Sequence, residues 1–222
     1  MKTVDGKRWK TETVAAHAEY LDNIKPGPLP GAVNMGEVVA WLNKRLPDDA
    51  IVTNGAGNYA AFLHRFFQYR GFKTQLAPTN GAMGYGVPAG IAAAILGRVA
   101  FTIAGDGDFL MNGQELATAV QHGAKTIILL LNNGMYGTIR MHQEREYPQH
   151  EAGSHLNNPD FAALARAYGY AGVRIRRADE FEAELLAALE RPQGTVIEVM
   201  LDPELITTRG SLAALTQASL KK

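Results

Sequence analysis

The sequence predicts a doubly wound α/β domain, in which helices cover both faces of a parallel sheet. Strand-like and helix-like patterns alternate from about residue 34 to residue 201. Two segments, Val99–Ala104 and Thr126–Leu131, are almost continuously apolar, as strands buried on both faces are. Polar residues bounded by glycines follow both segments. Alternation of this kind favours a parallel sheet over a sandwich or a helical bundle.

The other elements follow from local signals. Asn34, with Glu37 three positions later, resembles a capping box and predicts a helix to about Leu46. We also expect a turn and the first strand within Asp48–Thr53, a short strand at Gln75–Ala77, and strands at Gly172–Ile175 and Thr195–Leu201. Further helices are expected at Thr11–Asn23, Tyr59–Phe67, Val87–Leu96, Asn112–Gln121, Pro159–Tyr168 and Asp179–Leu189, the last capped by Asp179. Ser211–Lys222 is expected to contain a short exposed helix.

The chain divides into three parts. Residues 1–32 are unlike the rest, and Lys25–Gly31 (KPGPLPG) cannot continue a helix. We interpret residues 1–32 as a linker or the tail of a preceding domain, rather than an ordinary terminus, because the linker opens directly onto a well-patterned domain. Residues 33–206 form that domain, and residues 207–222 form a C-terminal tail.

Composition excludes several classes of function. Lys and Arg together number 22, as do Asp and Glu, so no net charge attracts nucleic acid or an anionic membrane. Cysteine is absent, which excludes disulfides, thiolate metal sites and cysteine nucleophiles. No stretch approaches the ~20 apolar residues of a membrane span, and the basic start lacks the apolar core of a signal peptide. We expect a cytoplasmic protein that binds neither nucleic acid nor membrane.

Asp106 and Asn133 are the candidate metal ligands. Each follows one of the two apolar strands, and open α/β sheets bind ligands beyond the carboxyl ends of their strands. Flanking glycines let a phosphate or metal approach the backbone. Carboxylate, amide and carbonyl oxygens suit Mg²⁺.

A dinucleotide site is the competing interpretation. Gly55, Gly57 and Ala60 match the glycine fingerprint of such sites in its Gly/Ala form. That fingerprint needs an acidic residue about 20 positions later to hold a ribose hydroxyl. No Asp or Glu occurs from residue 50 to residue 105, so we favour a phosphate-binding turn at a helix N-terminus.

The motif resembles that of a known family. Gly105–Gly107, with Asp106 at 27 positions before Asn133, resembles the thiamine diphosphate motif of the superfamily that contains acetolactate synthase, pyruvate decarboxylase and benzoylformate decarboxylase. Asn80–Gly90 resembles the family's loop beneath the aminopyrimidine ring of the cofactor. Gln114–Val120 and Asn158–Ala162 resemble acetolactate synthase sequences. The resemblance covers about residues 33–203 and corresponds to the family's diphosphate-binding domain only.

The resemblance implies a set of ligands. The Asp106 carboxylate, the Asn133 side-chain oxygen and the Met135 carbonyl would bind Mg²⁺. The implied contacts with thiamine diphosphate are Gly57, Asn58, Gly81, Met83, Gly107, Asp108, Phe109, Asn133, Met135 and Tyr136. Met83 would separate the two rings of the cofactor, and the Gly81 carbonyl would accept a hydrogen bond from its amino group. By its chemistry alone, Met83 would instead be a gap-filling core residue.

Two positions depart from the family pattern. Asp108 stands where the family commonly has serine, and a carboxylate beside phosphates is unfavourable, so we expect only its backbone N–H to contact the cofactor. Gly57-Asn58 stands where the family often has Gln-His, which leaves side-chain contacts in this loop open.

Residues just beyond the metal loop are candidates for substrate contacts, because this region lies near the family's active site. They are Tyr136, Arg140 and His142. The alternating charges of Glu144–Glu146 predict a solvated helix face. No histidine pair has metal-ligand spacing on a helix, and we interpret Glu115 as a structural residue.

We therefore expect a thiamine diphosphate- and Mg²⁺-binding domain of a 2-oxo-acid decarboxylase or an acetolactate-synthase-like carboligase. In the resembled enzymes a glutamate on a separate pyrimidine-binding domain activates the cofactor, and no glutamate here sits in that motif. The chain alone is then expected to be inactive, and its partners would be that domain, a small 2-oxo acid and further copies of itself. The alternatives are one subunit of a naturally split decarboxylase and a non-catalytic oligomerisation module.

Overall fold

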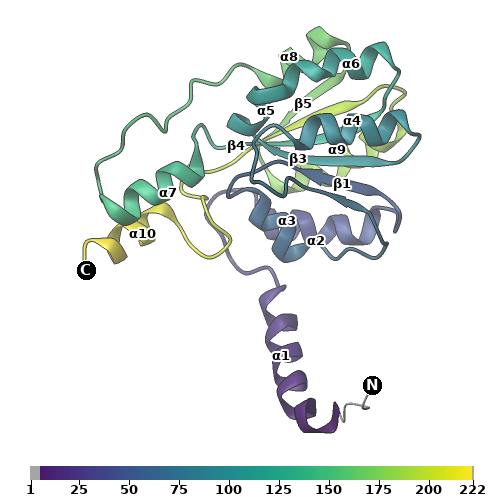
Figure 1. The fold of residues 1–222 in the computed structure, drawn as a ribbon. Helices are drawn as coiled ribbons and strands as arrows, with labels where there is room; N and C mark the ends of the chain where they lie inside the picture. Colours follow the sequence, from purple (N-terminus) through teal and green to yellow (C-terminus); the bar gives the residue numbers. More distant parts are fainter. Residues whose placement is uncertain (1–5, 222) are drawn as a thin grey trace.

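A computed structural model describes residues 6–221, in which six parallel strands form one sheet (Figure 1). The strand order is β2-β1-β3-β4-β6-β5. The strands are β1 (Ile51–Asn54), β2 (Gln75–Leu76), β3 (Ala100–Gly105), β4 (Thr126–Asn132), β5 (Ala171–Ile175) and β6 (Thr195–Met200). The predicted doubly wound α/β fold is confirmed.

Helices cover both faces of this sheet. The helices after residue 33 are α2 (Met35–Arg45), α3 (Ala60–Phe66), α4 (Gly86–Ile95), α5 (Asp106–Asn112), a 3₁₀ turn η2 (Gly113–Glu115), α6 (Leu116–Gln121), α7 (Gly137–Glu146), α8 (Phe161–Tyr168), α9 (Ala178–Glu190) and α10 (Leu212–Ser219). Helices α7 and α10 pack on each other and not on a face of the sheet. Helices α2, α3 and α9 pack on one face, and α4, α5, α6 and α8 pack on the other (Figure 1).

The central strand β4 shows why the apolar run is continuous. Its residues Ile127, Leu129 and Leu131 belong to the core beneath α2, α3 and α9. The alternate residues Ile128 and Leu130 belong to the core on the opposite face. Because successive side chains of a strand point to opposite faces, a strand buried on both faces is apolar at most consecutive positions.

Two local predictions are wrong. Asp106 lies in the first turn of helix α5 and not in a turn before a later helix, so helical structure begins six residues earlier than expected, at Asp106. The Asp106 and Asp108 carboxylates suit this position because acidic groups stabilise a helix N-terminus. Asp179 does not cap α9: it lies inside the helix and pairs with Arg177, while the Glu180 carboxylate accepts from the Arg177 backbone N–H at 3.3 Å.

The N-terminal segment stands clear of the domain (Figure 1). A 3₁₀ turn (Gly6–Trp9) leads into helix α1 (Lys10–Asn23), and neither contains a buried residue. Asn34 then begins α2 as predicted, since its side chain accepts from the Gly36 N–H at 3.0 Å. Among residues 6–221, no helix combines the length and apolar character needed to cross a membrane.

The C-terminal helix packs on α7 and is not merely an exposed tail. Leu212 of α10 is buried with Met135 and Ile206. Glu144 of α7 is also buried, at 1% exposure, which corrects the prediction of a solvated face. Its carboxylate pairs with Arg140 and accepts from the Thr216 hydroxyl of α10 at 2.7 Å. Alternating charges gave no hint of this burial, because Thr216 is 72 residues away in sequence.

Glu144 gives a pH-dependent prediction. Burial raises the pKa of Glu144, but hydrogen bonds from Thr216, the Gln149 N–H and Arg140 outweigh it and hold the pKa below its usual value. The stabilisation is therefore present above the ordinary Glu value of about 4.3 and lost as the pH falls through the lowered folded value. We expect Glu144→Gln to cost about 1.5–3 kcal/mol at pH 7, and less below pH 4. Denaturant unfolding of the wild type and of Glu144→Gln, at pH 7 and below pH 4, measures both free energies of unfolding. A difference between them that does not change with pH would contradict the lowered pKa of Glu144.

Candidate functional site

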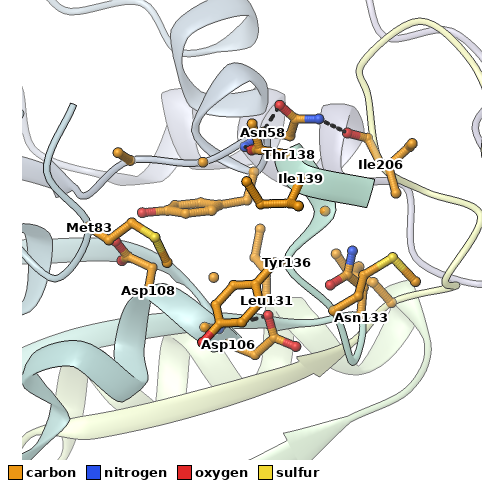
Figure 2. Close-up of a pocket in the computed structure, with 18 of the residues that line it drawn as sticks. Asn58, Met83, Asp106, Asp108, Leu131, Asn133, Tyr136, Thr138, Ile139 and Ile206 are labelled. Atoms are coloured by element: carbon orange, nitrogen blue, oxygen red, sulfur yellow. Dashed lines mark hydrogen bonds between the residues drawn. The ribbon is translucent and has the colours of Figure 1, made fainter. Parts of the chain in front are cut away.

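A pocket of about 230 Å³ lies at the carboxyl ends of β1, β3 and β4 (Figure 2). Strand β1 is flanked by β2 on one side and by β3 on the other, so the strand order reverses here, where open α/β sheets bind ligands. Five segments contribute to its lining: residues 56–59 with Phe62, residues 81 and 83, residues 105–108, residues 131, 133 and 135–139, and residues 201, 205 and 206.

Asp106 lies at the floor of this pocket and is 3% exposed. Its Oδ1 accepts from the Gly107 N–H at 2.9 Å. Its Oδ2 accepts from the Gly134 N–H at 2.8 Å and from Asn158 Nδ2 at 2.7 Å. Burial raises the pKa of the Asp106 carboxyl, although these hydrogen bonds oppose the increase. A bound cation would reverse that direction by favouring the ionised form.

The other predicted metal ligands lie beside Asp106. Asn133 and Met135 line the pocket, and Figure 2 shows the Asp106 and Asn133 side chains on its sheet-proximal side. Among the hydrogen bonds of residues 6–221, none involves the Asn133 side chain, so its oxygen is free for a ligand. No group of three or more His, Asp or Glu that could hold a metal occurs in the same residues. A cation here would rest on one carboxylate, neutral oxygens and the ligand's own phosphates, a donor set that fits Mg²⁺.

The Asp108 carboxylate is buried against the loop that carries Gly84, at the edge of the same pocket. Oδ1 accepts from the Gly84 N–H at 2.8 Å, and burial raises the pKa of this carboxyl. The Tyr59 hydroxyl lies near Asp108, and burial together with the Asp108 charge raises the pKa of that phenol. Neither Tyr59 Oη nor Asp108 Oδ2 has a hydrogen-bond partner among residues 6–221. In the described part of the chain no ion pair involves Asp108, and its carboxylate is held by the hydrogen bond from Gly84.

Met83 and Gly81 also line the pocket, and Figure 2 shows Met83 across from Asn133. Gly84 is held at both of its backbone groups, since Asp108 accepts from its N–H and Asn112 Nδ2 donates to its carbonyl at 3.0 Å. Its φ of 80° is one that glycine adopts readily. Met83 is 38% exposed beside the pocket, so it is not a core-filling methionine.

The remaining predicted cofactor contacts divide into two groups. Gly57, Gly107 and Tyr136 line the pocket, and the Tyr136 ring lies over Gly107, where a Cβ would come within 2.5 Å of it. Asn58 also lines the pocket, but its Nδ2 donates to the Ile206 carbonyl at 2.9 Å (Figure 2). The side chain of Phe109 does not reach the pocket: it is 1% exposed and packs edge-on against Phe161 in the core.

Two predicted substrate contacts lie outside the lining of the pocket. Arg140 pairs with Glu144 and with Glu151, at 3.3 Å for the latter. His142 is exposed on the surface of α7. Arg140 lies one helical turn after Tyr136, but Glu144 and Glu151 hold its guanidinium away from the lining of the pocket, and the His142 side chain is exposed.

Sequence reasoning missed three polar residues at or behind the site. Tyr59 lines the pocket, and its signal was its place directly after the predicted phosphate-binding turn. Asn132 and Asn158 lie behind Asp106 and bond to each other at 2.9 Å. Both stood within segments already recognised as similar to the family, but nothing local indicated that they meet.

The fold and site together define a thiamine diphosphate-binding domain of the doubly wound type. Residues 55–199 match the model of the family "thiamine pyrophosphate enzyme, C-terminal TPP binding domain", and the chain belongs to this family.

The chain is also similar in sequence to several acetolactate synthases. The chain is 35% identical over 177 residues to the acetolactate synthase large subunit of Parasynechococcus marenigrum, covering 78% of this chain and 28% of the relative. It is 31% identical over 198 residues to the mitochondrial acetolactate synthase catalytic subunit of Saccharomyces cerevisiae (88% and 28%) and 29% identical over 189 residues to the acetolactate synthase isozyme 3 large subunit of Escherichia coli (83% and 31%). The chain thus spans less than a third of the length of these relatives.

Proposed function

We propose that this chain binds thiamine diphosphate through Mg²⁺ as the diphosphate-binding domain of a 2-oxo-acid decarboxylase or acetolactate-synthase-like carboligase. One observation carries the proposal: the Asp106 carboxylate and the Asn133 side chain, which has no hydrogen bond among residues 6–221, share a pocket at the switch point of the sheet. The names of the relatives support the acetolactate-synthase-like chemistry.

Each wall of the pocket has a separate task. Asp106, Asn133 and the Met135 carbonyl would hold the cation, and the backbone N–H groups of residues 107–108 would face the phosphates. Met83 and the Gly81 carbonyl would hold the aminopyrimidine in place. When bound, the cofactor supplies the nucleophilic carbon and the electron sink for cleaving carbon dioxide from a 2-oxo acid. The protein contributes binding, orientation and exclusion of water.

The proposal includes a second domain that completes the site. The pocket of about 230 Å³ is smaller than the roughly 300–1,000 Å³ of complete ligand sites. Apolar side chains of its lining, among them Met83 and Ile139, are partly exposed. A pyrimidine-binding domain with the activating glutamate would cover them, from the same full-length protein or from another copy in a homo-oligomer. This chain alone would then bind the cofactor weakly and turn over no substrate.

Calorimetric titration of thiamine diphosphate into the chain, with and without Mg²⁺, tests the proposal. We expect binding that requires the metal. Binding that ignores Mg²⁺, or no binding even after the candidate pyrimidine-binding domain is added, would contradict it and favour an oligomerisation module of the same fold. Binding that appears only with a separately encoded domain would identify a naturally split enzyme.

Substitutions of Met83 distinguish a role in cofactor binding from a role in packing. Because its side chain is partly exposed, Met83→Ala should change the free energy of unfolding by no more than about 0.5 kcal/mol. We expect the same variant to weaken cofactor binding, and Met83→Leu to retain it. Urea unfolding and the calorimetric titration provide the two readouts. A large loss of stability with unchanged cofactor affinity would show that Met83 is a packing residue.

A further inference from the structure

A chain of polar side chains connects the edge strand β5 to Asp106. We call it the Asp106 relay, and it consists of Arg174, Glu198, Asn132 and Asn158. Arg174 Nε donates to Glu198 Oε2 at 2.8 Å, and Asn132 Nδ2 donates to Glu198 Oε1 at 2.8 Å. Asn158 Nδ2 then donates to Asn132 Oδ1 at 2.9 Å and to Asp106 Oδ2 at 2.7 Å. Glu198 has no exposed surface.

The relay can be arranged in only one direction. A carboxylate only accepts hydrogen bonds, so Glu198 obliges Asn132 to present its NH₂ group to it and its oxygen to Asn158. Asn158 must therefore direct its own NH₂ group toward two acceptors, Asn132 Oδ1 and Asp106 Oδ2. The Asn158 oxygen consequently has no partner among residues 6–221, although it is buried. An orphaned acceptor of this kind costs free energy, so the orientation is imposed by its neighbours.

The arrangement makes the two oxygens of Asp106 unequal. A carboxylate oxygen offers about two acceptor positions. Both acceptor positions of Oδ2 are occupied, by Asn158 Nδ2 and by the Gly134 N–H, which also donates to Asn132 Oδ1 at a longer 3.2 Å. Oδ1 has one donor, the Gly107 N–H, and keeps one free position.

We propose that the Asp106 relay positions Asp106 so that Oδ1 alone binds the divalent cation, which makes Asn158, Asn132 and Glu198 positioning residues of the metal site. The proposal rests on the proposed function, since it concerns the same cation. Hydrogen bonds that orient a ligating carboxylate raise the affinity for the metal, and their loss typically costs about 10–100-fold. The relay also explains why a glutamate can be buried in the middle of the sheet: Arg174 balances its charge.

Asn158→Leu tests the relay beside Asp106, and Glu198→Gln tests it at the carboxylate that orients Asn132. Mn²⁺ affinity in the presence of thiamine diphosphate would be measured by electron paramagnetic resonance, which counts free Mn²⁺ and needs no turnover. We expect each variant to lose about tenfold or more, and the double variant to lose less than the product of the two. Asn43→Leu is the matched control: the Asn43 side chain also makes two hydrogen bonds, here to the backbone of Phe66 and Gln68, but lies outside the relay. It should lower stability and leave Mn²⁺ affinity unchanged.

The outcomes separate this inference from the proposed function. If the wild-type chain binds Mn²⁺ and both relay variants stay within twofold of it, the relay is overturned while the metal site stands. If the wild-type chain binds no Mn²⁺ in the presence of the cofactor, the proposed function fails for the isolated chain. Ligand-free crystal structures of the wild type and of Asn158→Leu then test whether the relay orients Asp106. Rotation of the Asp106 carboxylate in Asn158→Leu would then support it, and an unchanged Asp106 would overturn it.

Discussion

Replacing Asp106 with alanine is expected to abolish metal-dependent binding of thiamine diphosphate. Asp106 supplies the one carboxylate among the proposed ligands, and its loss would leave the cation with neutral protein ligands. Loss of a direct ligand should exceed the roughly 100-fold upper range for residues that only orient a ligand. Calorimetric titration with Mg²⁺ provides the measurement. Asp106→Asn, which keeps an oxygen but loses the charge, should fall between the wild type and the alanine variant.

Thermal unfolding gives a second readout of the same prediction. A ligand at 100 times its dissociation constant stabilises the folded state by about 2.7 kcal/mol. The wild-type chain should gain stability from the cofactor with Mg²⁺, and Asp106→Ala should gain none. Asp179→Ala is the control, because Asp179 is exposed on α9 and pairs with Arg177 outside the pocket. Binding by Asp106→Ala within a few-fold of the wild type would show that another group holds the cation.

Phe109→Ala is expected to destabilise the fold by about 3–5 kcal/mol, as removal of a fully buried phenylalanine does. The Phe109 ring packs edge-on against Phe161, with centroids 5.5 Å apart, and occupies the space next to Gly113, where a Cβ would come within 2.5 Å of it. Its loss would leave a cavity between α5 and α8. Equilibrium unfolding in urea measures the change in the free energy of unfolding.

The same variant decides between two roles for Phe109. The family resemblance implied a cofactor contact, whereas the structure places this side chain in the core. Phe109→Leu should recover part of the lost stability by filling part of the cavity. If Phe109→Ala kept its stability but lost cofactor affinity, the residue would belong to the site after all.

Local patterns were sufficient to predict the elements that hold the site. The apolar runs that became β3 and β4 could only be strands buried on both faces, which placed helices on both sides of a parallel sheet. The carboxyl ends of parallel strands meet at one edge, so Asp106 and Asn133 were predicted to lie together, and both line one pocket. Errors at this level were local: periodicity does not show that helical structure starts at Asp106 itself.

Only the tertiary structure decided which side chains meet. Glu144 is buried because Thr216, 72 residues later, lies on a helix packed against α7. Asn132 hydrogen-bonds to Glu198, 66 residues away in sequence, and Asn58 hydrogen-bonds to the Ile206 carbonyl, 148 residues away. These contacts depend on how helices and strands pack across the sheet, which hydrophobic periodicity does not encode. The sequence by itself therefore determined the fold class and the edge of the sheet where the candidate site lies, because both follow from strand burial. The orientation of Asp106 was decided by long-range hydrogen bonds that form only once the chain has folded.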